Sequence, residues 1–215
     1  MIKRIVIFYG CLLVLGGCAY NDEPMPEIVH SYQTEPKFIQ PTVVKPSNNT
    51  KFSNKTILGY WLPPSHLEKN WSAIVIHHSG TPNGNAAIFD KWHRENNNWD
   101  GVGYDFVIGN GTDSTDGRVE VTFRWQQQIT GAHCKTPNNW ANEEAVGICL
   151  VGNFNDTSPT DSQMRSLLEL IRFLQNRYRI PRSRIYGHNT APGARATDCP
   201  GKNFPISKLK SMLDY

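Results

Sequence analysis

The sequence contains few cysteines and no pair of cysteines or histidines at the spacing of a zinc finger. Only five cysteines occur among 215 residues, and neither a Cys-x2-Cys nor a His-x3-His pair is present. This absence excludes a zinc finger, whose ligands come in such pairs. Any metal site must therefore take its ligands from distant parts of the chain, and the fold has to form before a metal can bind.

A strong charge of one sign and a long apolar run are also missing. The formal net charge is +3, and leaving out Lys3 and Arg4 reduces it to +1. A near-neutral surface argues against nucleic acid as the main partner. The apolar stretch from Ile5 to Leu15 is too short to span a bilayer, and neither a second such stretch nor an internal repeat follows.

The first residues have the features of an export signal. A basic pair precedes a short apolar core, and the segment ends in LGGC at residues 15–18. This boundary resembles the lipobox of bacterial lipoproteins, which signal peptidase cuts before a lipid-modified cysteine. We therefore expect a signal peptide over residues 1–17 and lipidation at Cys18, which would anchor the protein to a membrane. The alternative is an ordinary secretory signal with an incidental cysteine.

Residues 18–55 are typical of a flexible tether in front of one folded domain. The stretch is polar, has no sustained period of 2 or 3.6, and carries the prolines Pro24, Pro26, Pro36, Pro41 and Pro46. Ala19, rather than an aspartate, follows the modified cysteine and favours the outer membrane, facing the periplasm, in a Gram-negative cell. Residues 56–215 are long enough for one domain with its own core, which we expect to be a monomer.

Two histidine-bearing strings stand out because each places a histidine after a β-branched run. They are IVIHHS at residues 74–79 and IYGH at residues 185–188, and DCPG follows at residues 198–201. Such runs end at the rim of a sheet. Two imidazoles and one thiolate leave the fourth position of a tetrahedral zinc open for water, as in catalytic zinc sites.

The pattern of residues 56–215 predicts interleaved strands and helices. Apolar or alternating runs predict strands at residues 72–76, 104–108, 118–123, 146–151 and 184–186. Helical spacing predicts helices at residues 85–97, after the capping box of Thr160 and Gln163, and at 204–213. We therefore predict an α/β fold with a central mixed β-sheet, helices on both faces and a zinc site at the sheet rim.

Five segments in order resemble the amidase family that includes peptidoglycan recognition proteins and amidase-type phage lysozymes. The segments are IVIHHS, WDGVGYDFVIGNG, TGAHC, NEEAVGICLVGNF and IYGHNTAPGARATDCPG. The match runs over residues 73–204, nearly all of the folded part. The resemblance implies N-acetylmuramoyl-L-alanine amidase activity with Zn²⁺ as cofactor. Such enzymes act on peptidoglycan or muropeptides and cut the amide between the lactyl group of muramic acid and the stem peptide.

The resemblance places the zinc ligands at His77, His188 and Cys199. His78 is the alternative to His77, and only one of two neighbours on a strand can face a given side. Asp198 is the alternative to Cys199, because some relatives use an aspartate just before Pro-Gly. Thiolate is the better zinc ligand of the two.

Tyr104 and Thr197 match positions that assist catalysis in the family. A phenol near the metal can donate a hydrogen bond to the oxyanion that develops during amide hydrolysis, and Thr197 would assist the same charge. The alternative for Tyr104 is a strand tyrosine packed in the core, and the alternative for Thr197 is a turn-capping hydroxyl.

Three more residues are assigned to the substrate groove. His133 and Asn142 match groove positions of the family, whereas His93, on a predicted helix, is either a groove residue or a surface histidine. Cys134 and Cys149 form an even pair, which is either one disulfide or two buried free thiols.

Two other functions compete with the amidase interpretation. One is a peptidoglycan-binding module without catalysis, since some relatives lost the cysteine ligand and kept the groove. Cys199, Tyr104 and the two histidines argue against that interpretation here. The other is an amidase specific for anhydromuropeptides, which cleaves the same type of bond.

Overall fold

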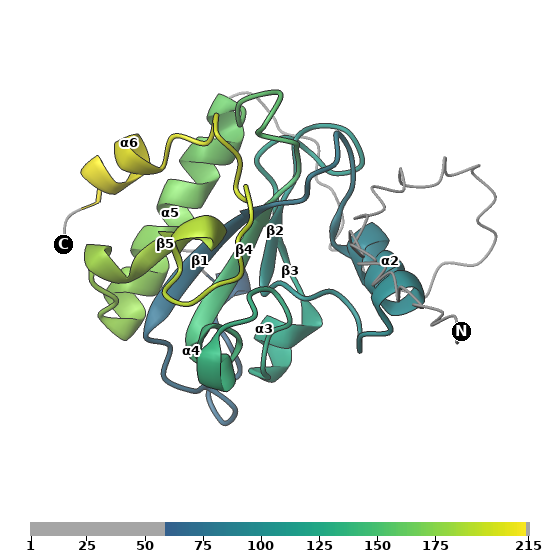
Figure 1. Ribbon diagram of the computed structural model, residues 1–215. Coiled ribbons are helices and arrows are strands. Elements are labelled where there is room, and N and C mark those ends of the chain that lie inside the picture. The colour runs from purple at the N-terminus through teal and green to yellow at the C-terminus, as the bar shows by residue number, and fades with distance from the viewer. Residues whose placement is uncertain (1–58, 214–215) are drawn as a thin grey trace, which may run out of the picture. The chain divides into compact units, whose positions relative to one another are not determined.

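The computed structural model describes residues 59–213, which are built around a mixed five-stranded sheet. The strands are β1 (Ala73–His78), β2 (Phe106–Ile108), β3 (Val119–Val121), β4 (Ala145–Leu150) and β5 (Ile185–Gly187) (Figure 1). Their order is β3-β2-β4-β1-β5, and within this sheet β3 alone pairs antiparallel to its neighbour. The four parallel strands therefore end at one edge of the sheet, where α/β proteins commonly bind ligands.

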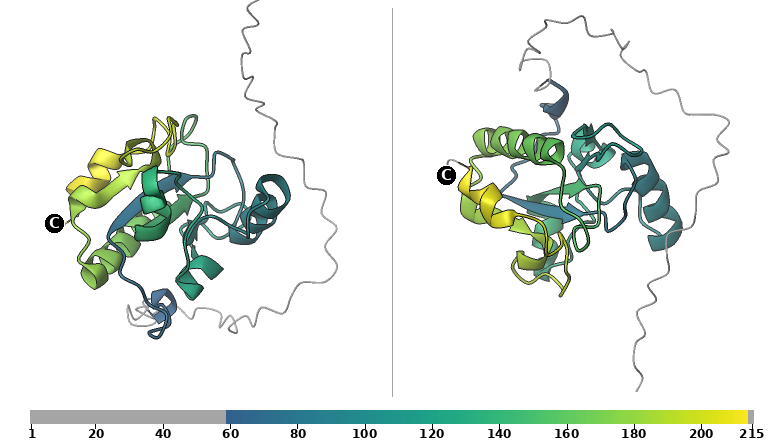
Figure 2. Two further views of the ribbon diagram at one scale, coloured as in Figure 1. Left: turned by 60° about the horizontal axis from the view of Figure 1, so that its bottom comes forward. Right: turned by 90° about the horizontal axis from the view of Figure 1, so that it is seen from above.

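Helices lie on both faces of the sheet, as the sequence predicts. Figure 2 shows α5 (Asp161–Tyr178) along one face, while α4 (Trp140–Glu144) packs against β4 and β1 on the other. The other helices that lie wholly within the described residues are α2 (Ala86–Asn97), α3 (Phe123–Gln127) and α6 (Ile206–Ser211), with 3-10 turns η1 (Pro137–Asn139), η2 (Arg182–Arg184) and η3 (His188–Thr190). None of the described helices is long and apolar enough to cross a membrane.

The start of α5 is fixed by the predicted capping box. The Thr160 hydroxyl accepts the Gln163 N–H at 3.0 Å, and the Gln163 side-chain oxygen accepts the Thr160 N–H at 3.1 Å. The Gln163 amide also donates to the carbonyls of Ile108 and Val151, at 3.1 and 2.9 Å. One side chain therefore fastens the helix start to the edge where β2 and β4 end.

The alternation of β1 divides the core between the two faces. Ile74 and Ile76 belong to the large cluster that α5 completes, and Ala73 and Val75 belong to a smaller cluster on the α4 side. Because successive strand side chains point to opposite faces, His77 continues the α4 side of this alternation. The core packing thus settles the direction of each histidine that follows.

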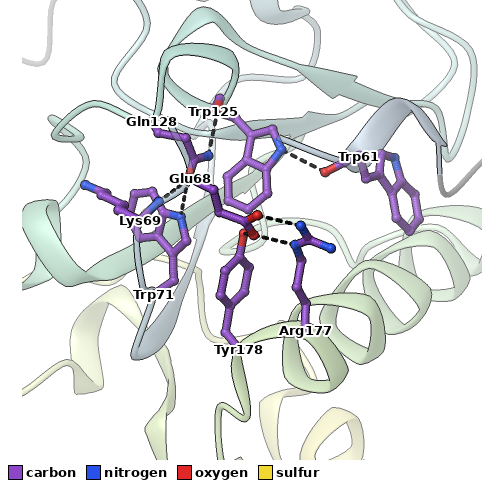
Figure 3. Close-up of polar contacts among 8 residues, drawn as sticks. All are labelled: Trp61, Glu68, Lys69, Trp71, Trp125, Gln128, Arg177 and Tyr178. Carbon is purple, nitrogen blue, oxygen red and sulfur yellow. Dashed lines mark hydrogen bonds and ion pairs between the residues drawn. The ribbon is translucent and has the colours of Figure 1, made fainter. Parts of the chain in front are cut away.

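Polar contacts anchor the segment before β1 at the opposite end of the strands (Figure 3). The Glu68 carboxylate accepts hydrogen bonds from the Arg177 guanidinium and, at 2.6 Å, from the Tyr178 hydroxyl. The Trp71 indole donates to the Gln128 side chain at 2.9 Å. These contacts hold the segment that leads into β1 against α5 and α3, at the end of β1 opposite to its two histidines.

Several elements are shorter than the sequence pattern predicts. The strand expected over residues 104–108 begins at Phe106, and the Tyr104 carbonyl before it accepts the Thr122 hydroxyl at 2.7 Å. The strand expected over 118–123 spans Val119–Val121, because α3 begins at Phe123. The helix expected over 204–213 spans Ile206–Ser211 after Pro205, which is its N-cap. None of these differences moves a predicted site residue out of its region.

Candidate metal centre

The two adjacent histidines at the end of β1 face opposite sides. The His77 side chain is 1% exposed and points to the α4 side. The His78 ring packs near Phe154, and its Nδ1 accepts the Phe154 N–H at 3.0 Å. The structure therefore brings His77, and not its neighbour, to the cluster described next.

His77, His188 and Cys199 lie together at the carboxyl edge of the sheet. Their candidate ligand atoms all lie within 4.8 Å of one another. His188 directly follows β5, whose Gly187 is paired with Ile76, so the two histidine rings come to a centroid distance of 4.6 Å. The Cys199 carbonyl accepts the Asn189 N–H at 2.8 Å and so folds the intervening loop back over the site.

The three residues fit a zinc ion both in type and in spacing. Zinc–sulfur and zinc–nitrogen bonds of about 2.3 and 2.0 Å at a tetrahedral angle place the two ligand atoms about 3.5 Å apart. The Cys199 Sγ lies 3.6 Å from the His77 Nδ1. Three protein ligands of these types also leave one tetrahedral position open, as catalytic zinc sites do. Asp198 is not part of this group.

The electrostatics of the cluster favour neutral imidazoles. Burial, and then the neighbouring histidines, hold the pKa of His77 well below its usual value, and burial also lowers the pKa of His188. Burial raises the pKa of the Cys199 thiol to about 12. A thiolate at this position therefore needs a bound cation, and metal binding there must release the proton.

Tyr104 lies against the same cluster. Its ring centroid is 5.2 Å from that of His77 and 5.7 Å from that of His93. Burial raises the pKa of the Tyr104 phenol well above its usual value, and the nearby sulfurs of Cys149 and Cys199 raise it further. The hydroxyl therefore stays protonated at neutral pH and remains a hydrogen-bond donor.

The Thr197 hydroxyl caps the turn that carries Cys199. It accepts the Cys199 N–H at 3.2 Å. A hydroxyl that accepts one hydrogen bond keeps its own hydrogen to donate. The turn-capping role is thus present, and it leaves the predicted assisting role available to the same side chain.

The three predicted groove residues are all buried. The exposed fractions are 7% for His133, 7% for His93 and 8% for Asn142. His133 lies behind His77, with its Nδ1 3.1 Å from the His77 Nε2. Burial lowers the pKa of the His133 imidazole to about 3, although its contact with the Ala145 carbonyl acts in the opposite direction.

His93 supports the backbone beside Tyr104 and is not a surface histidine. Its Nδ1 accepts the Gly103 N–H at 3.2 Å, and its ring lies 4.9 Å from that of Trp99. Burial, and then the charge of Arg124, lower the pKa of His93 to about 4.

Two hollows are lined by sequence neighbours of site residues. One, of about 340 Å³, is lined by Asn189 and Asp198, which are the sequence neighbours of two cluster residues, and also by Asn155 and Lys202. The other, of about 330 Å³, is lined by residues that include Trp99, Arg124 and Ala132, the last of which precedes His133 in the sequence.

Among residues 59–213, the two other cysteines are free thiols in separate apolar clusters. Cys134 packs on the α4 side near Val75, and Cys149 packs with Val107 and Phe89. The structure thus selects the free-thiol alternative. Cys149 is paired in register with His77, which brings its sulfur close to Tyr104. The strand pattern identified Cys149 as buried, but only the sheet order shows its neighbours.

The sequence pattern did not reveal the buried carboxyl of Asp105, next to Tyr104. The Asp105 Oδ2 accepts the Gly147 N–H at 2.8 Å, and the Oδ1 has no hydrogen-bond partner. Burial raises the pKa of Asp105 from 3.8 to about 7, against the opposing effects of the Gly147 N–H, Lys69 and Arg124. An aspartate inside an apolar strand run was the only signal for it in the sequence.

Replacing Asp105 with asparagine should change the pH dependence of stability. The folded-state pKa lies above the unfolded value, so the folded protein binds more protons between pH 3.8 and about 7. Wild-type stability therefore falls as pH rises through that window, and asparagine, which keeps an acceptor oxygen, escapes the loss. We expect the free energy of unfolding of Asp105→Asn, relative to wild type, to increase by about 1–4 kcal/mol between acidic and mildly alkaline pH.

Urea unfolding across this pH range measures the effect. Asp113→Asn, at an exposed position, is the matched control and should follow wild type. A stability difference between Asp105→Asn and wild type that is flat, or that shrinks with rising pH, would show that the buried carboxyl is ionised at no cost.

Comparison with known proteins agrees with this geometry. Residues 67–202 match the protein family described as N-acetylmuramoyl-L-alanine amidase. The chain is similar to peptidoglycan-recognition protein SC2 of Drosophila melanogaster, with 31% identity over 145 residues that cover 62% of this chain and 70% of that protein. It is also similar to the human N-acetylmuramoyl-L-alanine amidase, with 25% identity over 150 residues, 64% of this chain and 24% of that protein.

Solved structures show the same likeness. The endolysin LysCS, an N-acetylmuramoyl-L-alanine amidase from Clostridium intestinale, shares 34% sequence identity and a TM-score of 0.56. The alignment covers 66% of this chain and 83% of that one. A mutant of Drosophila PGRP-LB in complex with tracheal cytotoxin, at 23% identity and a TM-score of 0.52, shares the fold over 73% of this chain and 91% of that one.

Proposed function

The chain belongs to the N-acetylmuramoyl-L-alanine amidase family, and we propose that it is an active zinc amidase. The bond it would hydrolyse joins the lactyl group of N-acetylmuramic acid to the L-alanine of the peptidoglycan stem peptide. The observation that carries this proposal is the cluster of His77, His188 and Cys199, whose donor set and spacing suit a zinc with one open position.

Each residue of the site has a separate part in the proposed reaction. His77, His188 and Cys199 would hold the ion, which when bound supplies a Lewis acid that polarises the amide carbonyl and lowers the pKa of water. Tyr104 would donate its phenolic hydrogen to the carbonyl oxygen as negative charge develops there. Its raised pKa keeps that hydrogen in place at neutral pH. The Thr197 hydroxyl, next to Cys199, would stabilise the same charge.

The competing function is recognition of peptidoglycan without catalysis, because peptidoglycan-recognition proteins are among the relatives. The complete ligand set and Tyr104 support catalysis. Purified sacculi incubated with residues 56–215 distinguish the two functions. Free stem peptides found by mass spectrometry support the amidase, and binding to sacculi without any released peptide refutes it. The same assay with defined anhydromuropeptides shows whether released fragments or the intact wall are cleaved faster.

We also propose that Cys18, which lies outside the described residues, carries the lipid that anchors the protein to the outer membrane. The LGGC boundary at residues 15–18 supports this proposal. Cells fed a labelled fatty acid should label the native chain and not Cys18→Ser, which retains every other cysteine. Equal labelling of the two chains, or a native protein found wholly in the soluble fraction, would contradict it.

A further inference from the structure

We propose that His133 is a positioning residue, which holds His77 in the tautomer and ring orientation whose Nδ1 faces Cys199. The proposal rests on the proposed function only in taking His77 as a metal ligand. It gives His133 a task behind the metal centre instead of contact with the substrate.

The positions of the hydrogens follow from three distances. The His133 Nε2 lies 3.2 Å from the Ala145 carbonyl oxygen, which can only accept, so this nitrogen carries the hydrogen. The Nδ1 of the neutral His133 ring then carries no hydrogen, and it lies 3.1 Å from the His77 Nε2. The His77 Nε2 must therefore be the donor. This leaves the His77 Nδ1 without a hydrogen, 3.6 Å from the Cys199 Sγ.

The surrounding backbone is shaped to fit the His133 ring. A Cβ atom at Gly131 would lie 2.6 Å from the His133 Cδ2, and a Cβ atom at Gly147 would lie closer still. Both approaches are too close for any side chain. Glycine inside a strand weakens the strand, and Gly147 lies in the middle of β4. A glycine at this position is explained by the close approach of the ring.

Asn142 fixes the backbone that carries the ring. Its side-chain oxygen accepts the N–H groups of both His133 and Cys134, at 2.8 and 2.9 Å. Its amide nitrogen donates to the Asn139 side chain at 2.8 Å. Both ends of the Asn142 amide are thus engaged within the protein, so this side chain supports His133 instead of pointing to a ligand.

A positioning role and a substrate-contact role have different consequences. Both ring nitrogens of His133 are engaged and the residue is 7% exposed, so little remains for a substrate to contact. The partner of the distal nitrogen of a metal-bound histidine sets its tautomer and basicity, and its loss typically weakens metal binding by about 10–100-fold. A groove residue would change KM and leave metal affinity unaltered.

Two variants of nearly equal shape separate these roles. H133N places an amide oxygen where the His133 Nδ1 accepts, whereas H133L fills similar space with no acceptor. Zinc affinity would be measured by competition with a chelator, without substrate. We expect H133L to bind zinc about 10–100-fold more weakly than wild type and H133N to recover most of that loss. Equal zinc affinity in all three proteins would overturn the proposal.

Nitrogen-15 NMR of labelled histidines in the zinc-free protein tests the hydrogen positions directly. Wild type should show His77 with its hydrogen on Nε2, and H133L should show a mixture of tautomers. A hydrogen on Nδ1 of His77 in wild type would overturn the proposal even if H133L failed to fold. None of these measurements uses peptidoglycan, so a zinc-binding chain that cleaves nothing would refute the amidase and leave the role of His133 intact.

Discussion

The Cys199→Ser variant is expected to lose most of its bound zinc and, with it, nearly all amidase activity. The serine hydroxyl is a much weaker zinc ligand than a thiolate, and its shorter bond to Cβ draws the ligand atom back from the position of the Cys199 Sγ, 3.6 Å from the His77 Nδ1. The two remaining imidazoles would hold the ion weakly. Elemental analysis of purified protein should fall from about one zinc per chain to a small fraction of that.

The neighbouring Asp198→Asn is the matched control for this change. Asp198 lies next to Cys199 in sequence but outside the group of candidate ligand atoms. The Asp198→Asn variant should keep its zinc. Its zinc affinity should fall by no more than about 10–100-fold, which is typical when a residue around the ligands is changed. Zinc lost in Asp198→Asn and kept in Cys199→Ser would reverse the assignment of the third ligand.

The Tyr104→Phe variant is expected to bind zinc normally and to lose about 10²–10³ in kcat, as removal of one oxyanion donor typically does. The substitution removes a single hydroxyl and keeps the ring that packs 5.2 Å from His77. Burial holds the pKa of this phenol above its usual value, so the lost group is a donor throughout the neutral range. The measurement is kcat on a defined muropeptide, with zinc content determined on the same preparation.

Tyr178→Phe provides the matched control for Tyr104→Phe. The Tyr178 hydroxyl donates to Glu68 at the other end of the strands, so its removal should lower stability and leave kcat unchanged (Figure 3). A loss of only a few-fold in Tyr104→Phe would show that the tyrosine is packing and that Thr197 suffices. Loss of zinc in the same variant would show that its role is structural.

Much of the site could be predicted because its residues end regular strands. His77 and His188 each follow a β-branched run, and strand alternation limits the choice between His77 and His78 to one side. The capping box at Thr160 was predictable for a similar reason, since it depends on residues three apart. The local spacing of residues is therefore enough to predict these features.

The parts that sequence reasoning missed depend on strand order and burial. The order β3-β2-β4-β1-β5 brings Gly147 and Ala145 of β4 beside the loop that carries His133, and no local pattern contains that adjacency. No local pattern therefore indicated the contact of His133 with His77, and the strand alternation gave no sign that one oxygen of the Asp105 carboxyl lacks a partner. Long-range pairing decides these contacts.

The most direct test of the proposed activity is to locate the bond that is cut. A muropeptide would be digested in water labelled with heavy oxygen, and both products would be analysed by mass spectrometry. The proposed reaction places the heavy oxygen in the lactyl carboxylate of the sugar product and releases an unlabelled stem peptide with L-alanine at its amino terminus. An intact muropeptide after incubation with zinc-loaded protein, or heavy oxygen found in the peptide product, would contradict it.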